Sequence, residues 1–126
     1  MLKYIELKSG YAGNGPAWIG RVKQSKSGRT VYFNGKAFKK LAGGGLSGNH
    51  ADIETGEEYW ISGIKKDGQD RHWSGSGRIT IEAAAVSEYL RVIGSDRLDE
   101  RKFLVSHSIV IADPSKFHEL ENEKLS

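Results

Sequence analysis

Glycine spacing constrains the fold of this chain more than any other feature. Sixteen glycines, against two prolines, divide the sequence into short segments in which aromatic and β-branched residues alternate with polar ones. Such alternation is typical of β-strands, and the glycines between the segments favour tight turns. We therefore predict a single domain over residues 1–126 with an α+β fold: a curved, mainly antiparallel sheet built from hairpins, with one or two helices packed on it.

A first hairpin is predicted from residues 17–24 and 29–34, around a turn in which Gly28 takes a left-handed conformation. Pairing Gln24 with Arg29 assigns the side chains of both strands to two faces. The face that we expect to be the core side carries Trp18, Val22, Val31 and Phe33. The opposite face is basic and aromatic, and carries Ile19, Arg21, Lys23, Thr30 and Tyr32.

A second hairpin is predicted over residues 57–66 and 69–74, because Asp67-Gly68 is a strong signal for a type I′ turn. Its register places Lys65 opposite Asp70 as a cross-strand ion pair. The expected core side of this hairpin carries Trp60, Ile64 and Trp73. Further strands are expected at residues 3–7, 36–41 and 78–81.

The clearest helix signal lies in the second half of the chain. Apolar residues recur at i, i+3, i+4 and i+7, in the order Val86, Tyr89, Leu90 and Ile93. Gly94 stands where a C-terminal cap belongs. Residues 103–111 are apolar on both faces near their end, which predicts a central strand. Asp113 then caps a short helix that has Pro114 at its first position, with Phe117 and Leu120 facing inward.

Charge is distributed unevenly along the chain. The first 50 residues carry nine Lys and Arg and a single acid, Glu6, whereas the remaining 76 carry ten bases and fifteen acids. The net charge of +3 therefore hides a +8 part and a −5 part. Such asymmetry favours a polyanionic partner for one part, or mutual neutralisation of the two parts.

The candidate binding surface is a group of basic residues with one tyrosine: Arg21, Lys23, Tyr32, Lys36, Lys39 and Lys40. The basic side chains would neutralise phosphates, and Tyr32 or Phe38 would stack on an unpaired base. Alternatively, these cations face the acidic residues of 96–100 or 119–123 within the fold. Both interpretations stay open, because pairing between distant charges cannot be read from a sequence.

We predict no catalytic, metal-binding or cofactor-binding residue. The motif His50-x-Asp52-x-Glu54 would share one face of a strand and could hold a metal ion, but an exposed edge strand explains the same spacing. Asp70 could orient His72 as a general base, although Lys65 already faces that carboxylate. The chain has no cysteine, which excludes disulfides and thiolate nucleophiles. A small ribonuclease or hydrolase that uses His72 or His50 is the third functional hypothesis.

Three segments resemble a group of small bacterial proteins without an established activity: NGPAWIGRV, SGRTVYFNGK and GEEYWISGIKKDGQDRHW. The resemblance covers roughly residues 3–81, and members of the group carry the label 1-deoxy-D-xylulose-5-phosphate synthase. Thiamine-diphosphate enzymes are similar to one another in a Gly-Asp-Gly motif followed by Asn, and the nearest segment here is the turn at residues 66–69. A chain this short also lacks room for the two domains that enclose that cofactor, so we reject the label.

Small, cysteine-free bacterial proteins of this kind resemble immunity proteins in size and class. The acidic residues of 96–100 and 119–123 could complement a basic toxin, although a pI near 9.1 is high for this role. We therefore predict a non-enzymatic protein-binding module, most concretely an immunity-type protein that neutralises a bacterial toxin. The alternative is a nucleic-acid-binding module that uses the basic first hairpin.

The start of the chain alternates polar and apolar residues, so we expect no signal peptide, and no later segment approaches membrane-spanning length. A cytoplasmic location without a membrane partner is expected. The sequence leaves open the identity of the partner, the oligomeric state and the order of the strands.

Overall fold

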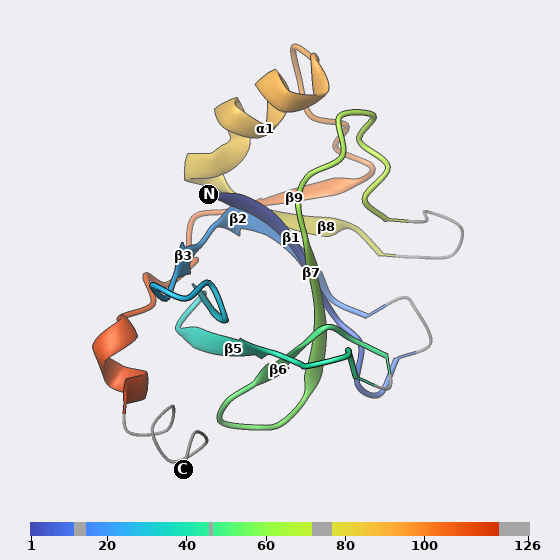
Figure 1. Cartoon of the computed structure of the whole chain (residues 1–126). Helices are drawn as coiled ribbons and strands as arrows, with labels where there is room; N and C mark the ends of the chain where they lie inside the picture. Colours follow the sequence, from blue (N-terminus) through green and yellow to red (C-terminus); the bar gives the residue numbers. More distant parts are fainter. Residues whose placement is uncertain (12–14, 46, 72–76, 119–126) are drawn as a thin grey trace.

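Figure 1 shows the computed structural model of the chain, which describes residues 1–11, 15–45, 47–71 and 77–118. These residues form nine strands, one α-helix and two short 3₁₀ helices. The strands are β1 (Leu2–Leu7), β2 (Ala17–Arg21), β3 (Lys23–Gln24), β4 (Thr30–Phe33), β5 (Lys36–Lys40), β6 (His50–Asp52), β7 (Glu58–Ser62), β8 (Ile79–Glu82) and β9 (Phe103–Ser106). The helices are η1 (Ala83–Ala85), α1 (Val86–Ile93) and η2 (Pro114–Phe117).

All the described strands belong to one sheet with the order β3-β4-β5-β6-β7-β1-β2-β8-β9. Six of its ladders are antiparallel, and β8 pairs in parallel with both β2 and β9. The crossover through α1 permits the β8–β9 pairing, because parallel neighbours need a long connection. The predicted sheet-dominated α+β fold is thus confirmed, with a single α-helix in the described residues.

The sheet curls back on itself because β2 and β3 are almost one continuous strand. Only Val22 separates them, yet β3 stands at one end of the strand order and β2 near the other (Figure 1). Apolar side chains from the curled strands fill the inner face. This inner core contains Ile5, Val22, Val31, Phe33, Phe38, Tyr59 and Ile61.

Two further apolar clusters lie on the outer face of the sheet. In the first, α1 covers β2, β8 and β9, and the ring of Tyr89 lies 5.3 Å from that of Phe103. The helix ends at Gly94 in a left-handed conformation, as its sequence predicts. In the second cluster, η2 covers β4 and β5, and the ring centroids of Phe117 and Tyr32 lie 6.1 Å apart. Asp113 caps η2 by accepting a hydrogen bond from the Ser115 backbone, which confirms the predicted cap.

The first hairpin is confirmed, but its register differs by two residues from the prediction. Gln24 pairs with Val31 rather than Arg29, because the Ser25 N–H donates to the Thr30 carbonyl and the loop closes later than expected. A shift of two residues keeps every side chain on its predicted face. The predicted core side is therefore correct. Val22, Val31 and Phe33 belong to the inner core, and Trp18 packs against it.

The second hairpin is only partly correct. Its turn exists, since Gly68 has a φ of 72° and its N–H donates to the Lys65 carbonyl. However, residues 63–71 form no strand, and Asp70 accepts a hydrogen bond from the backbone N–H of Lys65. Trp60 was predicted on the core side but is 43% exposed, because Tyr59 and Ile61 are the residues of β7 that face the inner core. Trp73 lies outside the described residues.

The predicted central strand at 103–111 is wrong in length and position. β9 spans only Phe103–Ser106 and stands at the end of the strand order, with Leu104 and Val105 exposed. The apolar side chains of β9 are therefore not buried between strands. Its outer edge is open in the described part of the chain. No helix in the described ranges has the length and apolar character needed to cross a membrane.

Candidate functional site

The six residues of the predicted binding surface do not form one continuous surface. Arg21 pairs with Glu88 of α1, with 3.2 Å between Nε and Oε1. Lys36 pairs with Asp52, with 3.4 Å between Nζ and Oδ2. Lys23 is exposed beside Arg21, and Lys39 and Lys40 lie at the far end of β5. The structure therefore neutralises two of the predicted cations within the fold.

Tyr32 was predicted to be exposed and available for stacking on a base, and this is wrong. Only 3% of its surface is exposed, because Phe117 of η2 packs on its ring. Phe38, the other proposed stacking residue, is 1% exposed in the inner core. Strand alternation gave the face of Tyr32 correctly, but it could not show that Phe117, 85 residues further along the chain, covers that face. Neither ring is accessible to a nucleobase.

Lys39 and Lys40 border a cavity of about 720 Å³ between the β3–β4 turn and the loop that follows β5. The other polar groups that line this cavity are Ser25, Ser27, Arg29 and Thr30. The Ser25 and Ser27 hydroxyls accept hydrogen bonds from the backbone N–H groups of Thr30 and Arg29, and lie 3.3 Å apart. One hydroxyl donates to the other, so one O–H stays available to a ligand. The lining thus combines cations with a hydroxyl donor.

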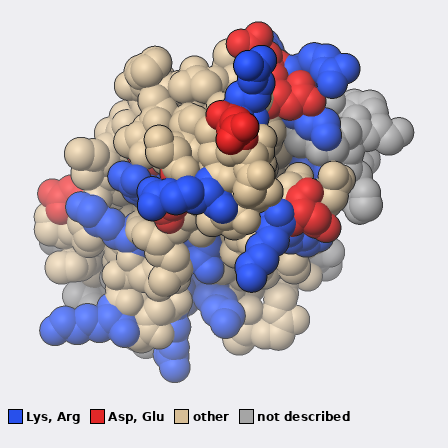
Figure 2. All heavy atoms as spheres, turned by 90° about the horizontal axis from the view of Figure 1, so that it is seen from above, with Lys and Arg blue, Asp and Glu red and all other residues tan. Residues whose placement is uncertain are grey.

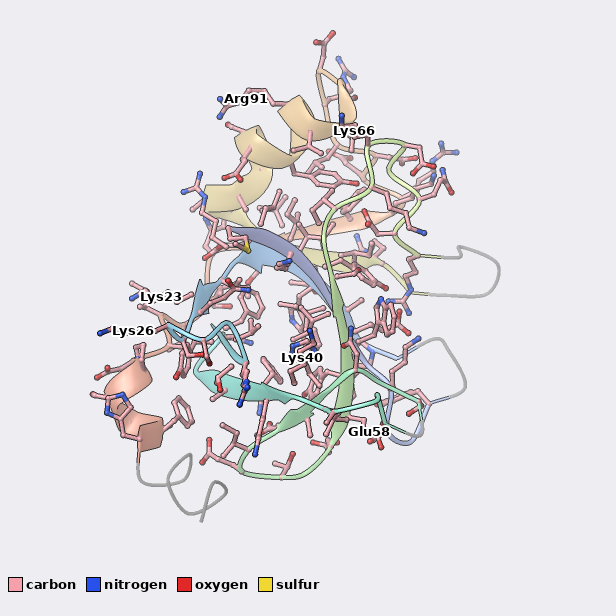
Figure 3. The ribbon with its side chains drawn as sticks, viewed as in Figure 1. Lys23, Lys26, Lys40, Glu58, Lys66 and Arg91 are labelled. Carbon is pink, nitrogen blue, oxygen red and sulfur yellow. The ribbon has the colours of Figure 1, made fainter. Side chains whose placement is uncertain are left out.

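Strand register brings a row of basic residues to one open end of the curled sheet. Lys40 pairs with His50 of β6, and the Lys40 N–H donates to the Arg29 carbonyl at 2.7 Å. Directly opposed residues share a face of a sheet, and Lys40 is two residues from Phe38 of the inner core. These three basic side chains therefore lie on the inner face, and Figure 3 shows Lys40 within the outline of the curl.

Lys3 reaches the same end from β1, since it is two residues before Ile5 of the inner core. Its charge acts on His50, as does that of Lys40. We call this group the basic rim, and it consists of Lys3, Arg29, Lys40 and His50, together with Lys39, which borders the same cavity from the other face of β5. The sequence prediction included only Lys39 and Lys40. The correct strand register and the β5–β6 pairing would have added Arg29 and His50.

His50 is 7% exposed, and its environment opposes protonation. Burial lowers its pKa to about 4, and the positive charges of Lys40 and Lys3 act in the same direction. Its Nδ1 lies 2.8 Å from the Oδ1 of Asn49. The imidazole is therefore neutral at physiological pH, in an otherwise cationic group.

The cations of the basic rim have no acidic partner among the described residues. The ion pairs of the described ranges join Lys8 to Glu6, Arg21 to Glu88, Lys36 to Asp52 and Arg101 to Asp99. Asp99, from the acidic segment 96–100, is thus paired within its own loop. Residues 119–123 lie outside the described residues. In Figure 2 the basic side chains in the lower part of the view have no acidic neighbours, whereas acidic groups accompany those in the upper part.

The His50-x-Asp52-x-Glu54 motif is arranged for structure. Asp52 is 1% exposed, and its Oδ1 accepts hydrogen bonds from the backbone N–H groups of Glu54 and Thr55 while Oδ2 faces Lys36. Glu54 is exposed. Within the described ranges, no three His, Asp or Glu side chains lie together as metal ligands. His72, the other proposed base, is outside the described residues.

A second candidate surface lies at the edge of the sheet that β9 forms. β9 pairs only with β8, so its outer backbone groups have no strand partner in the described part of the chain. Beside it, a groove of about 900 Å³ is bordered by Val86 and Leu90 of α1 and by Leu98, Phe103 and Val105. Charged side chains of residues 97–101 form the rim of this groove.

No model of a protein family matches the chain, and searches of the curated proteins and of the solved structures found no match. The resemblance stated from the sequence stays a prediction. The functional argument therefore depends on the geometry of the two surfaces.

Proposed function

We propose that this chain is a non-enzymatic binding module for nucleic acid, which it contacts through the phosphates at the basic rim. The observation that carries the proposal is that Arg29, Lys39 and Lys40 have no acidic partner among the described residues, whereas Arg21 and Lys36 do. Unpaired cations gathered at one site attract a polyanion, and the free energy comes largely from counterion release. The cytoplasm, expected from the sequence, is the proposed location.

The buried state of Tyr32 and Phe38 makes this proposal more specific. Neither ring can stack on a base, so binding is expected to depend on the backbone and to discriminate weakly between sequences. This differs from the sequence hypothesis, in which base stacking contributed.

The test measures binding of a fluorescent single-stranded oligonucleotide by anisotropy over a range of salt concentrations. Each lost phosphate contact reduces the slope of log K against log salt by about 0.7. The double variant Arg29→Ala/Lys40→Ala is expected to bind more weakly and with a slope smaller by about 1.4. The control, Lys66→Ala/Arg91→Ala, removes the same charge near α1 (Figure 3) and should retain the slope. Equal losses in both variants would contradict the proposal.

A second candidate function is the one that we ranked first from the sequence, binding of a protein partner such as a toxin domain. The open edge of β9 and the adjoining apolar groove support it. Leu104 and Val105 are 48% and 41% exposed, and an unpaired strand edge with apolar side chains can accept a strand from another chain.

This second function is tested by affinity purification after nuclease treatment at high salt. A stoichiometric protein is expected to remain bound to the wild-type chain and to be released by Leu104→Lys, which places a charge on the exposed β9 edge. The matched variant Val92→Lys, on the exposed side of α1, should retain the partner. A partner that binds all three chains equally would exclude the β9 edge as its site.

A further inference from the structure

His50 is the only member of the basic rim whose ordinary pKa lies near neutral pH, and its hydrogen bonds identify the atom that would take up a proton. The amide of Asn49 is fixed by Ile61, because Nδ2 donates to the Ile61 carbonyl and Oδ1 accepts from the Ile61 N–H. Oδ1 also lies 2.8 Å from Nδ1 of His50. An acceptor at that place requires an N–H on Nδ1, so the neutral imidazole has its lone pair on Nε2.

The charges that lower the pKa of His50 are both positive. Lys40 approaches from β5 and Lys3 from β1, while the paired residue on β7 is Tyr59. Glu58 is adjacent to Tyr59 in β7, and strand alternation places it on the outer face. Asp52, two residues further along β6 on the same face, accepts from the backbone N–H of Glu54 and faces Lys36. The site therefore combines several positive charges with a proton acceptor on the imidazole.

We propose that the basic rim binds a single phosphate group of the nucleic acid together with a proton on Nε2 of His50. The inference depends on the proposed function and specifies how that site works. A phosphate between Lys3, Arg29 and Lys40 would offset the positive charge that, together with burial, keeps the imidazole neutral. The protonated ring then supplies one more donor to the phosphate oxygens.

Binding and protonation are consequently linked. If binding stabilises the protonated imidazole by a given free energy, protonation stabilises the complex by the same free energy. Binding therefore tightens as pH falls. Each unit by which the phosphate raises the pKa of His50 corresponds to a tenfold tighter complex once the ring is protonated. Without ligand the pKa of His50 is about 4, so the imidazole is unprotonated at physiological pH.

The experiment uses the full chain and a short oligothymidylate without terminal phosphates, since its diesters and bases do not titrate between about pH 4 and 8. The pKa of His50 is followed by NMR of the imidazole with and without the oligonucleotide, and the signal is assigned with His50→Asn. We expect saturation to raise this pKa by one unit or more, and binding to tighten as pH falls. His107→Asn, at an exposed histidine, should retain the pH dependence.

A second variant keeps the test valid if His50→Asn does not fold. Lys40→Ala removes a cation that faces the imidazole, so it should raise the pKa of His50 in the free chain and also weaken oligonucleotide binding. A purely structural role for Lys40 would not produce both effects. If the oligonucleotide binds and the pKa of His50 stays unchanged, the inference fails while the proposed function stands. If the oligonucleotide does not bind at low salt, the proposed function itself fails.

Discussion

At the scale of single residues, buried polar side chains determine both local structure and the pH response. His50 and Asp52 are neighbours on the inner face of β6, yet they have different roles. Asp52 satisfies two backbone donors in the turn after β6 and faces Lys36. His50 is held neutral by burial and by two lysines. The motif was predicted to share one face of a strand, with an exposed edge strand as its explanation. Both are wrong, because Glu54 lies in the turn after β6 and β6 lies between β5 and β7.

The lowered pKa of His50 predicts that the chain loses stability in acid. The imidazole takes up a proton in the unfolded chain near its ordinary value of 6.5 but only near 4 in the folded one. Between these values the unfolded state binds more protons, so the free energy of unfolding falls as pH decreases, by about 3 kcal/mol in total from this group. Chemical denaturation at several pH values checks this. His50→Asn should lack this loss, so the difference in stability between the two chains should change by about 3 kcal/mol between neutral pH and pH 4. An equal pH dependence of both chains would contradict the prediction.

Asp52→Ala is expected to lower the free energy of unfolding by about 1–3 kcal/mol. The substitution leaves the N–H groups of Glu54 and Thr55 without their acceptor and Lys36 without its partner. Thermal denaturation measures the effect at neutral pH. Glu54→Ala removes an exposed carboxylate from the same turn and should change stability by less than about 0.5 kcal/mol. Equal effects of the two substitutions would show that Asp52 has no special role.

At the scale of elements, the predictions that rest on local sequence signals were correct, whereas those that depend on long-range contacts were not. The strands at 3–7 and 17–34 and the helix at 86–93 follow from alternation, a turn glycine and a cap, all of which act within a few residues. Residues 69–71 form no strand where the second hairpin was predicted to continue, and residues 72–74 lie outside the described residues. The strand predicted at 103–111 was wrong because β9 is short and pairs with β8, which lies beside β2 through parallel pairing. That partner choice involves residues about 60 positions apart, and no local pattern encodes it.

The C-terminal element η2 is predicted to stabilise the sheet by covering it. Phe117 is fully buried against Tyr32, Ala37, Ile53 and Ala112. Phe117→Ala should therefore lower the free energy of unfolding by about 3–5 kcal/mol, the usual cost of deleting a buried ring. Denaturant unfolding checks the value. Ile111→Ala, at a side chain that is 80% exposed, should have almost no effect. A small loss in Phe117→Ala would show that η2 does not contribute to the fold's stability.

At the scale of the whole molecule, the fold separates charges that the sequence groups together. Arg21 is neutralised by Glu88 of α1 and Lys36 by Asp52 of the neighbouring strand β6, whereas the cations at one open end of the curl have no acidic partner among the described residues. The sequence therefore predicted a basic region correctly in outline, but its members depend on strand register and on which acids fold back. His50 joins the rim through the pairing of β5 with β6, whereas Lys3 reaches it from β1, two strands further along the sheet.

The most direct measurement is a chemical-shift map of the ¹⁵N-labelled chain during titration with a single-stranded oligonucleotide at low salt. The proposal predicts that the largest shifts occur at Lys3, Arg29, Lys40 and His50, that they saturate, and that they disappear at high salt. Shifts concentrated on β9 and α1, or the absence of saturable shifts, would contradict a phosphate-binding role for the basic rim.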